Sequence, residues 1–122
     1  MKRATMPLDG SWLFRIDGEP QGWLKVKVPG DWDSYSPELF GYVGHGWYRR
    51  TFRPRAGWRG QRVHLRFEGA NSETTVWLNG RPAGAHSGGF APFELDVTGL
   101  IDWEGENALA VRVDNLPDAG RV

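Results

Sequence analysis

The residues of this sequence that could do acid–base chemistry are carboxylates, among them Glu68, Glu73, Glu94 and Asp96. Hydrolysis of a glycosidic bond needs two carboxylates that face each other across a cleft. Glu94 and Asp96 are two residues apart in a segment of alternating character, so both fall on one face of a strand. This spacing indicates a solvated strip, and we expect no catalytic residue in the chain.

Three histidines, His45, His64 and His86, raise the question of a metal site. None is paired at a ligand spacing such as HExxH, so surface or packing roles are favoured and no metal site is expected. The glycine-rich run 41–46 (GYVGHG) is followed by no expected helix, whose N-terminus a phosphate site would require. No Gly-x-Ser-x-Gly motif is present, and no cofactor is expected.

Seven tryptophans offer a different chemistry, because an indole face stacks well on the apolar face of a sugar ring. Trp77 has the opposite strand parity to Val76 and Leu78, so it should point to the other face of its sheet. Trp47, Trp58 and Trp103 are expected near turns. The sequence favours a structural role for most of these rings over sugar stacking.

The amide of Asn71 lies in the stretch EGANSETTVWLNG, between two turn signals. An Asn side chain can donate and accept a hydrogen bond at once, which suits a pair of sugar hydroxyls. It can equally be a turn former that bonds to its own backbone. The residues alone leave both interpretations open.

Short segments in which apolar and polar residues alternate, separated by turns, must position these side chains. The pattern predicts strands over 12–17, 24–28, 46–52, 62–68, 74–78, 81–86, 93–97 and 108–113, with a long loop from 31 to 46 and a type I′ turn at Asn79-Gly80. The 17 glycines and 8 prolines suit turns better than helices. The sequence therefore predicts an all-β domain with two packed sheets, a sandwich spanning 1–122.

Composition excludes several classes of function. The 15 basic residues balance the 15 acidic ones, which argues against a nucleic-acid partner or a membrane surface. No cysteine is present, which rules out a disulfide framework and fits a reducing compartment, so a cytoplasmic location is expected. The first residues carry no apolar run of the kind that a secretion signal needs.

Six ordered motifs, LDGSWLF, VPGDW, GWYRRTF, GWRGQRVHLRFEGANSETTVWLNG, HSGGFAPFELDVT and GENALAVRVDN, carry a resemblance over nearly the whole chain. Together they resemble the N-terminal sugar-binding domain of glycoside hydrolase family 2, the β-galactosidase, β-glucuronidase and β-mannosidase group. HSGGFAPFE and YVGHGWYRR are more similar to the β-glucuronidases, and GANS is more similar to the β-galactosidases.

The resemblance implies a jelly-roll sandwich of the galactose-binding type and a place beside a catalytic barrel. In the family the catalytic glutamates lie in that barrel, downstream, and in β-galactosidases the Asn that matches Asn71 reaches toward the sugar. We therefore expect a non-catalytic domain that packs on the barrel, helps to shape its sugar site, and is a fragment of a longer glycosidase.

Two alternatives remain open, a free-standing carbohydrate-binding module and a structural or subunit-interface sandwich without ligand. Because the family continues beyond VRVDN with a further strand, we also expect an uncovered sheet edge, with either self-association into a homo-oligomer or a rearrangement of the termini that covers the gap. The alternative is that Leu109, Val111 and Val113 already close the core.

Overall fold

The computed structural model describes residues 5–16, 22–28, 44–67, 73–87 and 92–114. Strands dominate this part of the chain, and two 3₁₀ helices, η2 (Ala56–Trp58) and η3 (Thr98–Leu100), connect them. The strands are β1 (Gly10–Ile16), β2 (Leu24–Val28), β3 (His45–Phe52), β4 (His64–Phe67), β5 (Glu73–Leu78), β6 (Arg81–His86), β7 (Phe93–Asp96) and β8 (Asn107–Asp114). No helix in the described segments is long and apolar enough to cross a membrane.

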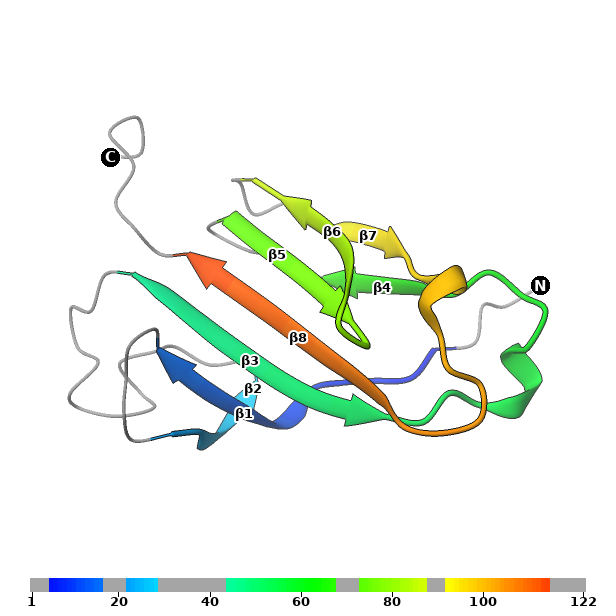
Figure 1. Cartoon of the computed structure of the whole chain (residues 1–122), viewed down its shortest axis with the longest axis horizontal. Helices are drawn as coiled ribbons and strands as arrows, with labels where there is room; N and C mark the ends of the chain where they lie inside the picture. The colour runs from blue at the N-terminus through cyan, green and yellow to red at the C-terminus, as the bar shows by residue number, and fades with distance from the viewer. Residues whose placement is uncertain (1–4, 17–21, 29–43, 68–72, 88–91, 115–122) are drawn as a thin grey trace.

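The strands form two antiparallel sheets (Figure 1). The larger sheet has the order β2-β1-β3-β8-β5-β6, and the smaller sheet pairs β4 with β7. β8 therefore lies between β3 and β5, although β4 to β7 all come between β3 and β8 in the chain. The predicted all-β, two-sheet jelly-roll class is confirmed.

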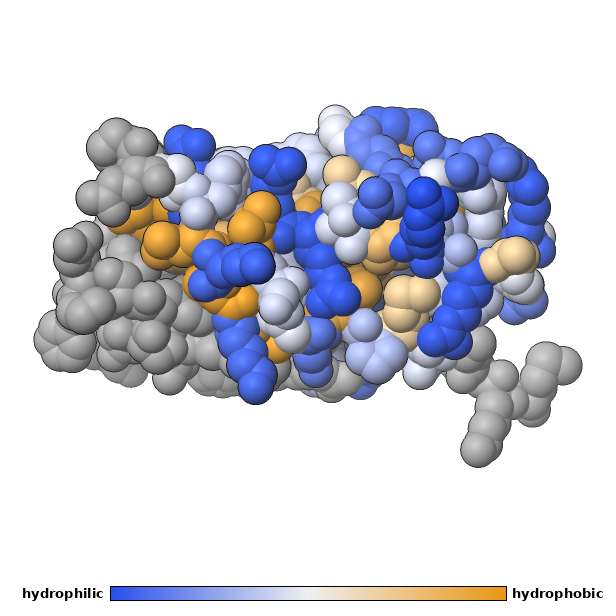
Figure 2. Space-filling model, turned by 90° about the horizontal axis from the view of Figure 1, so that it is seen from below, coloured by the Kyte–Doolittle hydropathy of each residue, from blue (hydrophilic) through white to orange (hydrophobic). Residues whose placement is uncertain are grey.

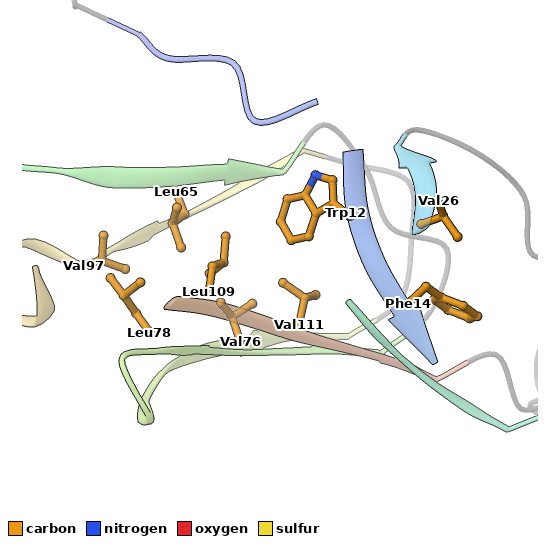
Figure 3. Packing of buried hydrophobic residues seen from close by; sticks show 9 residues of the cluster. All are labelled: Trp12, Phe14, Val26, Leu65, Val76, Leu78, Val97, Leu109 and Val111. Carbon is orange, nitrogen blue, oxygen red and sulfur yellow. The ribbon is translucent and has the colours of Figure 1, made fainter. Parts of the chain in front are cut away.

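The core lies between the two sheets. Figure 3 shows Leu65 and Val97, from the side of the smaller sheet, pointing toward Val76, Leu109 and Val111 of the larger one. Strand alternation places these side chains on the inner face, as it does for Trp12 and Phe14 of β1. These buried side chains fill the space between the two sheets.

Every predicted strand exists, with small differences at the ends. β1 begins at Gly10 and not at Trp12, and β4 begins at His64 and not at Arg62. Val97 lies one residue beyond β7, yet it is fully buried, and its N–H donates to the carbonyl of Val63 at 2.8 Å. The two-residue hairpin is confirmed, because Asn79 has φ of 55° and Gly80 has φ of 77°, the positive values that a type I′ turn requires.

Gly84 marks a place where the two sheets approach closely. It lies in β6 beside a register shift between Val76 and Trp77 of β5. A Cβ atom at this position would lie 2.7 Å from Cδ2 of Leu95 in β7. The absence of a side chain here lets the edge of the larger sheet close against the smaller one.

Both edges of the larger sheet carry features that oppose pairing with another chain. On β2, Lys25 and Lys27 are exposed, and charged side chains on an edge strand disfavour its addition to a second sheet. Figure 2, the view from the side of β1 and β2, shows hydrophobic surface interrupted by hydrophilic side chains. On β6, Pro82 has no N–H to donate. Self-association therefore stays a prediction, and these two edges offer it little support.

Candidate functional site

One end of the sandwich gathers the strand ends that bound the segments 68–72 and 88–91. Phe67, the last residue of β4, pairs with Phe93, the first residue of β7, and Thr74 pairs with His86. Phe93 stacks on both rings, with centroid distances of 4.7 Å to Phe67 and 4.1 Å to His86. We name these three rings the aromatic end. They form a rigid base from which both segments depart.

Asn71, the one predicted substrate-binding residue, falls in the segment 68–72, outside the described residues. Its neighbours in the chain are placed: Phe67 belongs to the aromatic end, and Glu73 begins β5 opposite Asp114 of β8. The segment that carries the amide is therefore anchored at both of its ends in ordered sheet. The hypothesis that Asn71 contacts a sugar stays a prediction.

The three histidines have separate surroundings. His45 begins β3 with Nε2 at 3.5 Å from a carboxylate oxygen of Asp114, and His64 Nε2 lies 3.9 Å from Asp96. His86 belongs to the aromatic end, where its Nδ1 is buried and has no hydrogen-bond partner among the described residues. Within the described ranges, no three His, Asp or Glu side chains form a group that could hold a metal ion.

Glu94 and Asp96 lie on one exposed face of β7, as their spacing predicts, and each faces a cation from the β4 side. Arg66 Nη1 is 3.3 Å from Glu94 Oε2, and Arg62 donates to Asp96 from Nε at 3.1 Å and from Nη2. Thr98 donates to Asp96 through its hydroxyl at 2.6 Å and its N–H at 3.0 Å. The strip is therefore a row of cross-strand ion pairs that ties the smaller sheet together.

The bonds to Asp96 predict an acid-dependent stability. Hydrogen bonds from the Thr98 side chain and backbone, and then from Arg62, hold the pKa of Asp96 well below its ordinary value of 3.8. Because the folded state lowers this pKa, its stabilising contribution is complete above the unfolded pKa and is lost as the pH falls. We expect the difference in melting temperature between wild type and Asp96→Asn to shrink from about pH 6 to about pH 3. A difference that stays constant over this range would contradict the linkage.

The outward face of the larger sheet carries a lattice of tryptophans and arginines. We define the outer face as the side chains of the larger sheet that point away from the smaller sheet. Two rows cross it from strand to strand: Arg15, Trp47, Arg112 and Thr75 in the first, and Leu13, Arg49, Ala110 and Trp77 in the second. Trp77 thus points away from the core, as its parity predicts. Trp47 is the third residue of β3, within the strand that the sequence predicts over 46–52.

Cation–π contacts organise this lattice. The Trp47 and Trp77 ring centroids are 5.3 Å apart, and the guanidinium carbon of Arg112 lies 5.7 Å from one and 5.8 Å from the other. At the far side, Arg49 lies 5.1 Å and Arg15 5.6 Å from the Trp23 ring. Such contacts restrict the rotamers of both partners and hold the cations in place. Sequence reasoning weighed the tryptophans but missed the arginines, whose matching strand parity was the available signal.

An open depression of about 980 Å³ lies on the outer face. Small side chains form its floor, namely Ser11, Thr51, Ala108 and Ala110, while Trp47, Trp77, Arg49 and Lys25 rise around them. Among the carboxylates of the described residues, only Asp9 lines it. The arrangement can stack a flat apolar ring and can pair with an anion.

A sandwich with ordered aromatic rings, a cationic outer face and loop-bearing strand ends belongs to the class of β-sandwich binding domains. A profile of one such family, described as the sugar binding domain of glycosyl hydrolases family 2, matches residues 5–121. The chain belongs to this family.

Relatives of known activity agree with this assignment. A β-glucuronidase from Bacteroides fragilis is 31% identical over 93% of the chain and 17% of its own length. A β-galactosidase from Thermoanaerobacter pseudethanolicus is 40% identical over 90% of the chain and 15% of its own length. The solved structure of Bifidobacterium dentium β-glucuronidase, complexed with coumarin-3-O-glucuronide, is 38% identical with a TM-score of 0.83, over 94% of this chain and 21% of that one. The chain thus spans about a fifth or less of these relatives.

Proposed function

We propose that this chain works as the non-catalytic sugar-binding domain of a longer β-glycosidase, packed on the catalytic barrel and helping to shape its sugar site. The observation that carries the proposal is the family match over 5–121 in a chain that spans 15 to 21% of three glycosidase relatives. A cytoplasmic location accords with the absence of cysteine. The relatives include both β-glucuronidases and β-galactosidases, so the proposed substrate is a β-glucuronide or a β-galactoside.

Within this function, the aromatic end is the part of the domain that presents the sugar-facing segment. The stacked rings of Phe67, Phe93 and His86 hold the strand ends from which 68–72 and 88–91 depart. Asn71 follows the end of β4 and precedes the start of β5 by only a few residues, so a short tether limits its reach. We assign to its amide a hydrogen bond to a substrate hydroxyl.

The test is Asn71→Ala in the longer enzyme. Loss of a hydrogen bond made to the substrate in the transition state costs about 1–3 kcal/mol, so kcat/KM should fall roughly five- to 150-fold. Asn71→Gly is the matched control for the backbone, since it keeps the freedom to adopt positive φ and also lacks the amide. Both variants should lose activity equally if the amide contacts the sugar. Full kcat/KM in the glycine variant would show that Asn71 acts only as a turn former and does not contact the sugar.

A further inference from the structure

We propose that the outer face of the larger sheet is a second binding site, specific for an oligosaccharide that carries uronate carboxylates. The site is the depression between Trp77 and Trp47 on one side and Arg49 and Lys25 on the other. Its described lining shares no residue with the aromatic end. The proposal holds whether or not the segment that carries Asn71 meets a sugar.

The open shape of the depression suits an extended ligand. Ala110 separates Arg49 from Trp77 along one cross-strand row, and Thr51 pairs with Ala108 in the next. The larger side chains therefore stand around a low floor. A shallow trough on a rigid antiparallel sheet accepts an extended chain of rings without any movement of the backbone. An enclosed pocket for a single small molecule would need walls on all sides, which this face does not have.

The charge of the outer face suits an anionic ligand. Three arginines of the outer face, Arg15, Arg49 and Arg112, have tryptophan rings as partners. Among the residues that the structure describes, none of the recorded ion pairs joins a carboxylate to any of these three side chains. By contrast, Arg62 and Arg66 on the side of the smaller sheet are each paired with a carboxylate. Around the depression, the described residues thus place Arg49, Arg50 and Lys25 against a single carboxylate, Asp9. Arg15 and Arg112 lie on the same face beyond the lining.

The outer face combines cationic guanidinium groups with apolar indole rings. A guanidinium stacked on an indole uses its plane for the cation–π contact and keeps its in-plane N–H groups for a planar carboxylate. The neighbouring indole faces can cover the apolar C–H face of a pyranose ring. A uronate sugar presents both groups on one ring. A neutral sugar would leave the guanidinium groups unused, and a simple anion would leave the tryptophans unused.

The experiment is calorimetric titration of the 122-residue chain with a galacturonate hexamer at low salt, and with maltohexaose as the neutral probe. We expect the uronate probe to bind at least about tenfold more tightly than the neutral one. Added salt should weaken that binding, because the contacts are charge-assisted and exposed. Trp77→Ala and Arg49→Gln should each weaken it by at least about fivefold. Circular dichroism and thermal melting show whether each variant is folded.

The chain offers a matched control pair outside this face. Arg55 lies 5.6 Å from the Trp58 ring beside η2, so it is also an arginine stacked on a tryptophan. Arg55→Gln and Trp58→Ala should leave the affinity for the galacturonate hexamer within about twofold of wild type. An equal loss in these controls would show that any exposed Arg–Trp pair binds the probe, and it would overturn the assignment.

Two other results would also overturn the proposal. Equal affinity for the charged and neutral hexamers would show that the arginines play no part in recognition. Dimerisation of the chain that Trp77→Ala abolishes, together with no binding of the galacturonate hexamer at millimolar concentration, would show that the outer face is a protein–protein contact.

Discussion

Truncation of Phe14 to alanine should lower the free energy of unfolding by about 4 kcal/mol, the middle of the range for a buried Phe. Phe14 is fully buried in β1, and its ring centroid lies 5.0 Å from that of Tyr48 in β3. The substitution removes the ring from the part of the larger sheet that lies farthest from the strands of the smaller sheet. Urea unfolding followed by tryptophan fluorescence measures the change, and the melting temperature should fall by roughly 15 °C.

Leu24 provides the control for Phe14, because the two residues are direct cross-strand partners. Leu24 is 39% exposed, so Leu24→Ala deletes apolar atoms that already touch water. We expect this variant to lose less than about 1 kcal/mol. A similar loss in both variants would mean that the edge strand β2 contributes more to stability than the burial pattern indicates, and it would contradict the prediction for Phe14.

Strand periodicity predicted most of the strands because alternate side chains of a strand face the core, whereas β6 was predicted from the Asn79-Gly80 turn signal before it. In β8, Leu109 and Val111 alternate with Ala110 and Arg112, and such a pattern fits a half-buried strand. Periodicity could not predict the pairing order. β8 enters between β3 and β5 through contacts that are distant in sequence, and the alternation of a strand does not depend on which neighbour it has.

The contacts on the outer face are a second feature that the sequence alone does not predict. Parity placed Trp77 on it, but parity alone does not show which polar residues on other strands lie beside an indole. Arg112 reaches both Trp47 and Trp77 because register sets Trp47 and Thr75 opposite Arg112. The lattice is thus a product of register, which depends on long-range pairing. For Asn71, by contrast, the hypothesis of a sugar contact depends on the GANS motif alone.

Asn107 has an importance that sequence reasoning missed, since an Asn after Glu106 is typical of a turn. The structure buries it completely at the start of β8. Its Nδ2 donates to the carbonyls of Asp102 at 2.9 Å and Gly105 at 3.2 Å. Its Oδ1 accepts from the Asp102 N–H and from Asn79 Nδ2, both at 2.8 Å. All four hydrogen-bonding positions of the amide are therefore filled.

The side-chain amide of Asn107 connects three parts of the chain that are distant from one another in the sequence. Asn79 belongs to the β5–β6 hairpin, and it also donates to the carbonyl of Leu100, at the end of η3. Its Oδ1 accepts from the Ala108 N–H at 2.8 Å. Asn107 and Asn79 together fasten the hairpin, the loop after η3 and β8 at the end of the sandwich opposite the aromatic end. The loop keeps its shape because one side chain provides the partners that a strand would otherwise supply.

Asn107→Ala should therefore lower the free energy of unfolding by about 3 kcal/mol, because it leaves backbone groups of Asp102 and Gly105 without partners in a part-buried network. Asn107→Asp should be at least as destabilising at neutral pH, although aspartate has nearly the same shape. It would place a carboxylate oxygen against the carbonyls of Asp102 and Gly105, where the amide now donates. Urea unfolding of the two variants measures both effects. If the aspartate variant kept wild-type stability while the alanine variant lost it, the side chain would act by filling space, and the four hydrogen bonds would contribute little.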